Sequence, residues 1–184
     1  PFLRIEASPR GLTFAQFAHA DLEAVQRVRE RLPWYVPHIA FEGPTIPEEG
    51  IEVFTSAYPF LVALEKSDEV MVYSMVKIMH THFDEYKDNA PGAGGWTLDR
   101  QKFEQAFVPF HEGAIRYYKE IGAWTDKADE NNQRNLYRQS ILRGAWNEFL
   151  PSAPDGYQEF EEAWTKYREQ ALARVNLITL GQGL

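Results

Sequence analysis

Residues 33–50 constrain the fold of this chain more than any other stretch, because no regular helix can pass through them. The stretch contains four prolines and two glycines. Proline fixes φ and removes a backbone hydrogen-bond donor, and glycine favours turns. We therefore expect a long connector without regular secondary structure between the residues before position 33 and those after position 50.

A strand pattern and a helix pattern precede this connector. Residues 12–17 alternate in polarity and predict a short strand. Asp21 is a good helix-capping residue, and the apolar positions that follow it recur at helical spacing. The sequence therefore predicts an amphipathic helix over residues 22–32, which ends at Pro33.

Another strand pattern follows the connector. Residues 51–65 are rich in β-branched and aromatic side chains, which predicts one long strand or two strands bent around Pro59. Ser67 then predicts the start of a helix whose apolar stripe reaches Tyr86. Thr97 can start a further short helix that ends at Phe107.

The last third of the chain predicts two helices, over residues 126–150 and 155–176, and no strand. Strand–helix units followed by helices alone indicate an α/β fold with a helical tail. The second helix carries a mostly aromatic stripe at three-and-four spacing, which favours core packing and alternatively suits a ligand or a partner chain. Its members are Tyr157, Phe160, Trp164, Tyr167 and Ala171.

The composition excludes several classes of function. The net charge of -8 argues against nucleic acid as the main partner, because a phosphate backbone binds basic surfaces. The chain has no cysteine, so disulfides, thiol nucleophiles and cysteine metal sites are excluded. No apolar run is long enough to predict a transmembrane helix.

The histidines offer little support for catalysis or metal binding. His80 and His82 are two residues apart, so a helix would point them to different faces, whereas zinc-binding pairs on helices are four apart. His111 lies in a distinctive motif, but its adjacent acid, Glu112, is poorly placed to orient the ring. We interpret His111 as the cap of the helix that begins at Glu112.

No enzyme signature supports a catalytic function. The chain has no nucleophile elbow, no phosphate-binding loop and no dinucleotide fingerprint. Most carboxylates fall on the polar faces of predicted helices, as at Asp84-Glu85 and Glu161-Glu162. We therefore expect a protein that is not an enzyme and needs no cofactor.

Several segments together resemble one family. "VPFHEGAIRYYKEIGAW" (108–124) resembles the C-terminal signature of the TAXI family, the extracytoplasmic solute receptors of TRAP transporters. The family usually has proline after the histidine, where this chain has Glu112, and both residues suit the first turn of a helix. Other segments resemble the family in the same order: "IEASPRGLTFAQF", "LPWYVPHIA", "AYPFLVALE", "SDEVMVYSMVKIMHTHFDEYKD" and "WTDKADENNQRNLYRQSILRGAW".

The resemblance implies part of a two-lobed periplasmic-binding-protein fold of type II, with the N-terminal lobe absent and a C-terminal helical extension. On this interpretation residues 1–50 are the remainder of lobe two and the connector. Residues 51–125 are the returning strand and helices of lobe one, and residues 126–184 are the extension. The implied protein is periplasmic and passes a small organic anion, an amino acid or a dicarboxylate, to the TRAP permease membrane subunits.

The expected ligand contacts lie near the connector, at Tyr35, Thr55, Ser56 and Tyr58. The hydroxyls of these residues can donate hydrogen bonds, and the tyrosine rings offer a stacking face. Packing at a hinge is the alternative role for all four. An alternative function is a truncated structural module that uses residues 126–176 for partner binding or self-association, and burial of the aromatic stripe within the chain would argue against it.

The motif that carries the resemblance is itself predicted to be scaffolding. Gly113 would allow its helix to approach a neighbouring helix closely, and His111 would cap that helix. Ile115, Tyr117 and Tyr118 would provide packing.

Overall fold

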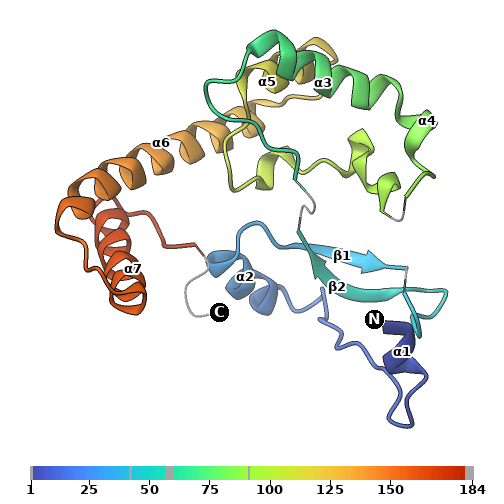
Figure 1. Cartoon of the computed structure of the whole chain (residues 1–184). Helices are drawn as coiled ribbons and strands as arrows, with labels where there is room; N and C mark the ends of the chain where they lie inside the picture. The colour runs from blue at the N-terminus through green and yellow to red at the C-terminus, as the bar shows by residue number, and fades with distance from the viewer. Residues whose placement is uncertain (1, 42, 57–59, 91, 181–184) are drawn as a thin grey trace. The chain divides into compact units, whose positions relative to one another are not determined.

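The computed structural model describes residues 2–41, 43–56, 60–90 and 92–180, and Figure 1 shows its elements. The chain divides into two compact units, each described by itself below. One unit consists of residues 1–56 together with 180–184, and the other of residues 57–179. The predicted class, mixed α/β, is confirmed, and helices predominate. The three-part domain organisation stays a prediction.

The first unit contains a two-stranded sheet and two helices among its described residues. Strands β1 (Val36–Ala40) and β2 (Ile51–Thr55) pair antiparallel, with Val36 opposite Thr55 and Ala40 opposite Ile51. The helices are α1 (Phe2–Glu6) and α2 (Leu22–Arg31). The Asp21 carboxylate accepts a hydrogen bond from the Ala24 amide at 2.9 Å, so the predicted cap of α2 is confirmed.

The prediction that residues 33–50 contain no regular element is wrong, because β1 lies within them. Pro37 is tolerated because β1 pairs with a single strand, β2, among the described residues. The edge of β1 that faces away from β2 needs no amide donor, so a proline there leaves the β1–β2 ladder intact. The turn after the strand uses Gly50 at φ +78°, where a Cβ would lie 2.5 Å from the Ile39 side chain.

The two strand predictions around β1 are also corrected. Residues 12–17 form no strand, although the Phe17 amide donates to the Glu52 carbonyl of β2 at 2.9 Å. The strand predicted over 51–65 ends at Thr55, and residues 60–64 are irregular. The predicted bend at Pro59 lies outside the described residues. Strand propensity alone did not suffice here, because a strand needs a partner for its backbone groups.

All the regular elements among the described residues of the second unit are helices. Asp68, rather than the predicted Ser67, caps the first helix by accepting from the Met71 amide at 2.8 Å. The predicted single helix is interrupted at His82, and two short 3₁₀ segments, η2 and η3, replace the helix predicted between Thr97 and Phe107. The elements are α3 (Glu69–Thr81), α4 (Phe83–Tyr86), η1 (Ala93–Trp96), η2 (Leu98–Arg100), η3 (Phe103–Gln105), α5 (Glu112–Glu120), α6 (Asp126–Phe149), η4 (Leu150–Ser152) and α7 (Tyr157–Ala173).

Helices α3 and α5 lie side by side because Gly113 carries no side chain (Figure 1). A Cβ at this position would lie 2.4 Å from the Glu69 carbonyl oxygen and 2.8 Å from the Tyr73 amide nitrogen. Ile115 and Tyr117 are buried on the same helix, at 5% and 2% exposure. The predicted close approach and packing of this helix are therefore confirmed.

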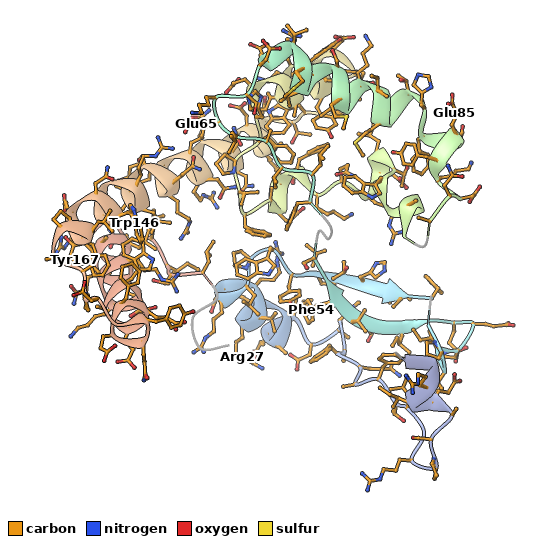
Figure 2. The ribbon with its side chains drawn as sticks, in the orientation of Figure 1. Arg27, Phe54, Glu65, Glu85, Trp146 and Tyr167 are labelled. Carbon is orange, nitrogen blue, oxygen red and sulfur yellow. The ribbon has the colours of Figure 1, made fainter. Side chains whose placement is uncertain are left out.

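Helices α6 and α7 form a hairpin around an aromatic seam, with Trp146 and Tyr167 labelled in Figure 2. The Phe149 ring lies 5.4 Å from Phe160 and Trp164 and 5.6 Å from Tyr167. The predicted packing role of the stripe is confirmed for these three residues. It is wrong for Tyr157, which is 84% exposed.

Three asparagines of α6 hold the segment that precedes α5. Asn132, which is 2% exposed, accepts from the Phe110 amide at 2.8 Å. Asn131 and Asn135 both donate to the Ala106 carbonyl at 2.8 Å. These bonds satisfy backbone groups of an irregular segment, which would otherwise be costly to bury.

Tyr118 of α5 makes the stability of this unit sensitive to alkaline pH. Its ring packs 4.6 Å from the Phe103 ring, and burial raises the pKa of its phenol to about 12, from 10.0. Between these values the folded chain keeps a proton that the unfolded chain has lost, so rising pH favours unfolding. We expect a loss of about 2–3 kcal/mol between pH 10 and pH 12, measured by urea unfolding across that range.

The Tyr118→Phe variant should lack this part of the pH dependence, since it removes the ionisable group and keeps the ring. Tyr137→Phe, at a tyrosine that is 49% exposed, is the matched control and should keep it. An unchanged slope in Tyr118→Phe would assign the alkaline loss to another group.

Candidate functional site

Three of the four predicted ligand contacts come together at one end of the β1–β2 ladder. Thr55 is the last residue of β2 and pairs with Val36, the first residue of β1. Tyr35 and Ser56 are the next residues outward on the two strands, so the antiparallel register brings them near each other. Tyr58 lies outside the described residues. The structure thus places these three residues at one end of the ladder, and their ligand role stays a prediction.

The hydroxyls at this end of the ladder are available to a ligand. Within the described part of the chain, no hydrogen bond involves the side chain of Tyr35, Thr55 or Ser56, and all three residues are half-buried. The Trp34 ring lies 6.3 Å from the Tyr35 ring and adds an apolar surface.

His19 is a polar residue near β2 that the sequence reasoning missed. Its Nε2 is 2.9 Å from the Val53 carbonyl oxygen, and its backbone amide donates to the Glu52 carboxylate at 3.1 Å. Its Nδ1 is 3.7 Å from the other Glu52 oxygen. With the bond from Phe17 to the Glu52 carbonyl, these contacts attach residues 17–19 to β2. Thus His19 supports the strand that carries Thr55.

His111 confirms the scaffolding interpretation of its motif. Its Nδ1 accepts from the Gly113 amide at 3.1 Å, and its Nε2 lies 3.2 Å from the Ser67 carbonyl oxygen. Both bonds form together when the proton is on Nε2, so the ring caps α5 and ties it to the residue before α3. With both ring nitrogens engaged, neither remains to act as a general base.

The other two histidines of the second unit have separate partners. His80 Nδ1 lies 2.7 Å from the Tyr117 hydroxyl, and His82 Nδ1 lies 2.7 Å from Glu85 Oε1 on α4. Figure 2 labels Glu85. Burial raises the pKa of the Tyr117 phenol, so this group stays neutral at physiological pH. Because their partners differ, His80 and His82 do not form a metal-binding pair.

Two negative findings concern only the residues that the structure describes. No three His, Cys, Asp or Glu side chains in the described ranges come close enough together to hold a metal ion. None of the described helices combines the length and the apolar character that a membrane span requires.

Comparison with known proteins gives a match to a protein family. The model of the NMT1-like family matches residues 6–122, which span both strands and helices α2 to α5. No curated protein and no solved structure matches the chain. The matched range contains Tyr35, Thr55, Ser56 and the His111 motif, and it ends before α6.

Proposed function

Because this chain belongs to the NMT1-like family, a family related to periplasmic binding proteins, we propose that it is a solute-binding component of a TRAP transporter of the TAXI type. In this role it works in the periplasm and presents its solute to the TRAP permease membrane subunits. The solute is a small organic anion, an amino acid or a dicarboxylate. Ligand binding would accompany the closure of two lobes about a hinge.

The observation that carries this proposal is the set of unpaired hydroxyls at the end of the β1–β2 ladder. Tyr35, Thr55 and Ser56 are half-buried, and their side chains make no hydrogen bond within the described part of the chain. None of the three hydroxyls is a fully buried, unpaired atom in the described residues, so a ligand oxygen would take the place of water as their partner. The family match covers all three positions.

The chemistry of these side chains suits a carboxylate. Each hydroxyl can donate one hydrogen bond, and a carboxylate is an acceptor with two oxygens. Hydrogen bonds to a charged acceptor are stronger than neutral ones. The rings of Trp34 and Tyr35 would cover the aliphatic part of the solute. Since the donors are neutral hydroxyls, we expect moderate rather than very tight affinity.

The test is calorimetric titration of the full chain with L-glutamate, L-aspartate, succinate and fumarate. We expect saturable binding of at least one of them. Tyr35→Phe and Thr55→Val each remove one donor with little change in shape and should each weaken that binding about tenfold, the value of one hydrogen bond to a charged group.

Two matched substitutions serve as controls. Tyr137→Phe and Thr13→Val make the same chemical changes at exposed positions outside the ladder end and should leave the affinity unchanged. Absence of binding by all four anions would contradict the proposed solute class. Equal weakening by Thr13→Val and Thr55→Val would contradict the proposed location of the site.

The alternative role, an interaction module formed by residues 126–176, gains no support from the aromatic seam. Phe160, Trp164 and Tyr167 pack against α6 within the chain, so they do not form a surface for another protein. Self-association through these helices stays a prediction.

A further inference from the structure

A hollow of about 170 Å³ lies in the second unit, where α3 gives way to α4 and the 3₁₀ segments begin. It shares no residue with the end of the β1–β2 ladder, which belongs to the first unit. Neither the His111 motif nor the aromatic seam contributes to it. Its lining consists of His80, Thr81, Phe83, Asp84, Trp96, Thr97 and Leu98.

One carboxylate lies in the lining of this hollow. Asp84 is the acid in its lining, and no lysine or arginine lines it. The Asp84 carboxylate already binds an ammonium group, because its Oδ1 accepts from Lys87 Nζ at 2.6 Å. This hydrogen bond raises the pKa of the Lys87 ammonium. Asp84 Oδ2 has no partner in the described part of the chain, so the carboxylate can accept a second ammonium.

The two threonine hydroxyls of the lining are available as acceptors. Thr81 Oγ1 donates its hydrogen to the Lys77 carbonyl at 2.9 Å, and Thr97 Oγ1 donates to Asp99 Oδ1 at 2.7 Å. A hydroxyl has one hydrogen and two lone pairs, so both oxygens are left with lone pairs only. A ligand that brings N–H donors therefore fits these oxygens, and a carboxylate does not.

The remaining walls suit a cation as well. Trp96 is half-buried and lines the hollow, and in the described ranges its indole makes no contact with another aromatic ring. Tryptophan has the aromatic face that attracts cations most strongly. His80 is fixed on the inner side by its bond to the buried Tyr117 hydroxyl, at 2.7 Å. The imidazole wall is therefore held in place before a ligand arrives.

We propose that this hollow binds a small organic cation, a protonated primary amine of a few carbon atoms. Its ammonium hydrogen-bonds to Asp84 and the two threonine hydroxyls and lies near the face of Trp96, and its alkyl part lies against Phe83 and Leu98. The acidic net charge of the chain, -8, raises the local concentration of such cations. This site is independent of the proposed anion site and opposite to it in charge preference.

The test is titration of the full, ¹⁵N-labelled chain with n-propylammonium, followed through the indole N–H signal of Trp96. That signal is assigned as the one that disappears in Trp96→Phe. We expect a saturable shift with a dissociation constant on the order of 1 mM, as fits a ligand with few atoms at an exposed carboxylate. The neutral isostere 1-propanol and the anion acetate should produce no saturable shift.

Three charge variants locate the interaction. Asp84→Asn should weaken propylammonium binding about fivefold, the value of one partly exposed ion pair. Asp88→Asn removes the same charge next to the hollow without lining it, and should leave the affinity unchanged. Lys87→Gln removes the internal ammonium that competes for Asp84 and should tighten binding about threefold.

Each opposite result overturns the proposal. An unshifted Trp96 signal means that no amine binds here, and saturable binding of acetate contradicts the charge preference. Equal effects of Asp84→Asn and Asp88→Asn would indicate general attraction to an acidic chain rather than a site. Because the anion titrations report on residues of the other unit, either proposal can fail without the other.

Discussion

Replacing Gly113 with alanine is expected to lower the free energy of unfolding by about 2–3 kcal/mol. The added Cβ would lie 2.4 Å from the Glu69 carbonyl oxygen and 2.8 Å from the Tyr73 amide nitrogen. Both are backbone atoms of α3, so no side-chain rotation can relieve the contact, and α5 has to move away from α3. Urea unfolding followed by circular dichroism measures the shift in midpoint.

Gly144→Ala is the matched control for this substitution. Gly144 also lies in a helix, but no heavy atom lies within 4 Å of a Cβ added there. Alanine should therefore stabilise α6 by up to about 1 kcal/mol, because it is a better helix former than glycine. If the two substitutions shifted stability in the same direction, the close approach of α3 and α5 would not be the function of Gly113.

Phe149→Ala is expected to destabilise the second unit by about 3–5 kcal/mol. Phe149 is 5% exposed, and its ring contacts four other rings of the α6–α7 seam: Trp146, Phe160, Trp164 and Tyr167. Truncation leaves a cavity whose aromatic walls are too rigid to close it fully. Thermal unfolding followed by calorimetry measures the loss.

Tyr157→Ala is the control, since it removes a larger aromatic side chain from the same hairpin where 84% of that residue is exposed. It should change the stability by less than about 0.5 kcal/mol. A small effect of Phe149→Ala would mean that the seam is not the core of the hairpin. A large effect of Tyr157→Ala would mean that its exposed ring is covered by another chain.

The local signals of the sequence were reliable where a single residue determines a structure. Asp21 caps α2, His111 caps α5, and Gly113 allows the close helix approach, as the residue types predicted. Helical spacing also predicted the aromatic residues of α7 that pack against α6. Tyr157 is the exception, because it lies in the first turn of α7, beyond the reach of the α6 rings.

The strands were harder to predict, because a strand depends on a partner that is often distant in sequence. Residues 12–17 have strand character but form no strand, although Phe17 donates a backbone hydrogen bond to β2. The proline and glycine content of residues 33–50 led to a prediction of no strand there. Pro37 is nevertheless compatible with β1, because one edge of a two-stranded sheet needs no hydrogen-bond donors.

The candidate sites were predictable to different degrees. Residue types near the connector suggested Tyr35, Thr55 and Ser56, and the register of β1 and β2 brings them together. The cation hollow had no sequence signal, since His80 lies in α3 and Trp96 in η1, with α4 between them, and no spacing rule predicts that they line one hollow. The role of Asn132 was also missed, because its hydrogen-bond partner is the backbone amide of Phe110, which no side-chain pattern indicates.

The central claim is that this chain binds a small organic anion at the end of the β1–β2 ladder. The most direct measurement is the change in backbone amide signals of the ¹⁵N-labelled chain during titration with L-glutamate and succinate. The account predicts the largest saturable shifts at Tyr35, Thr55 and Ser56, with little change at Tyr137. Saturable shifts confined to other residues, or none at all, would contradict it.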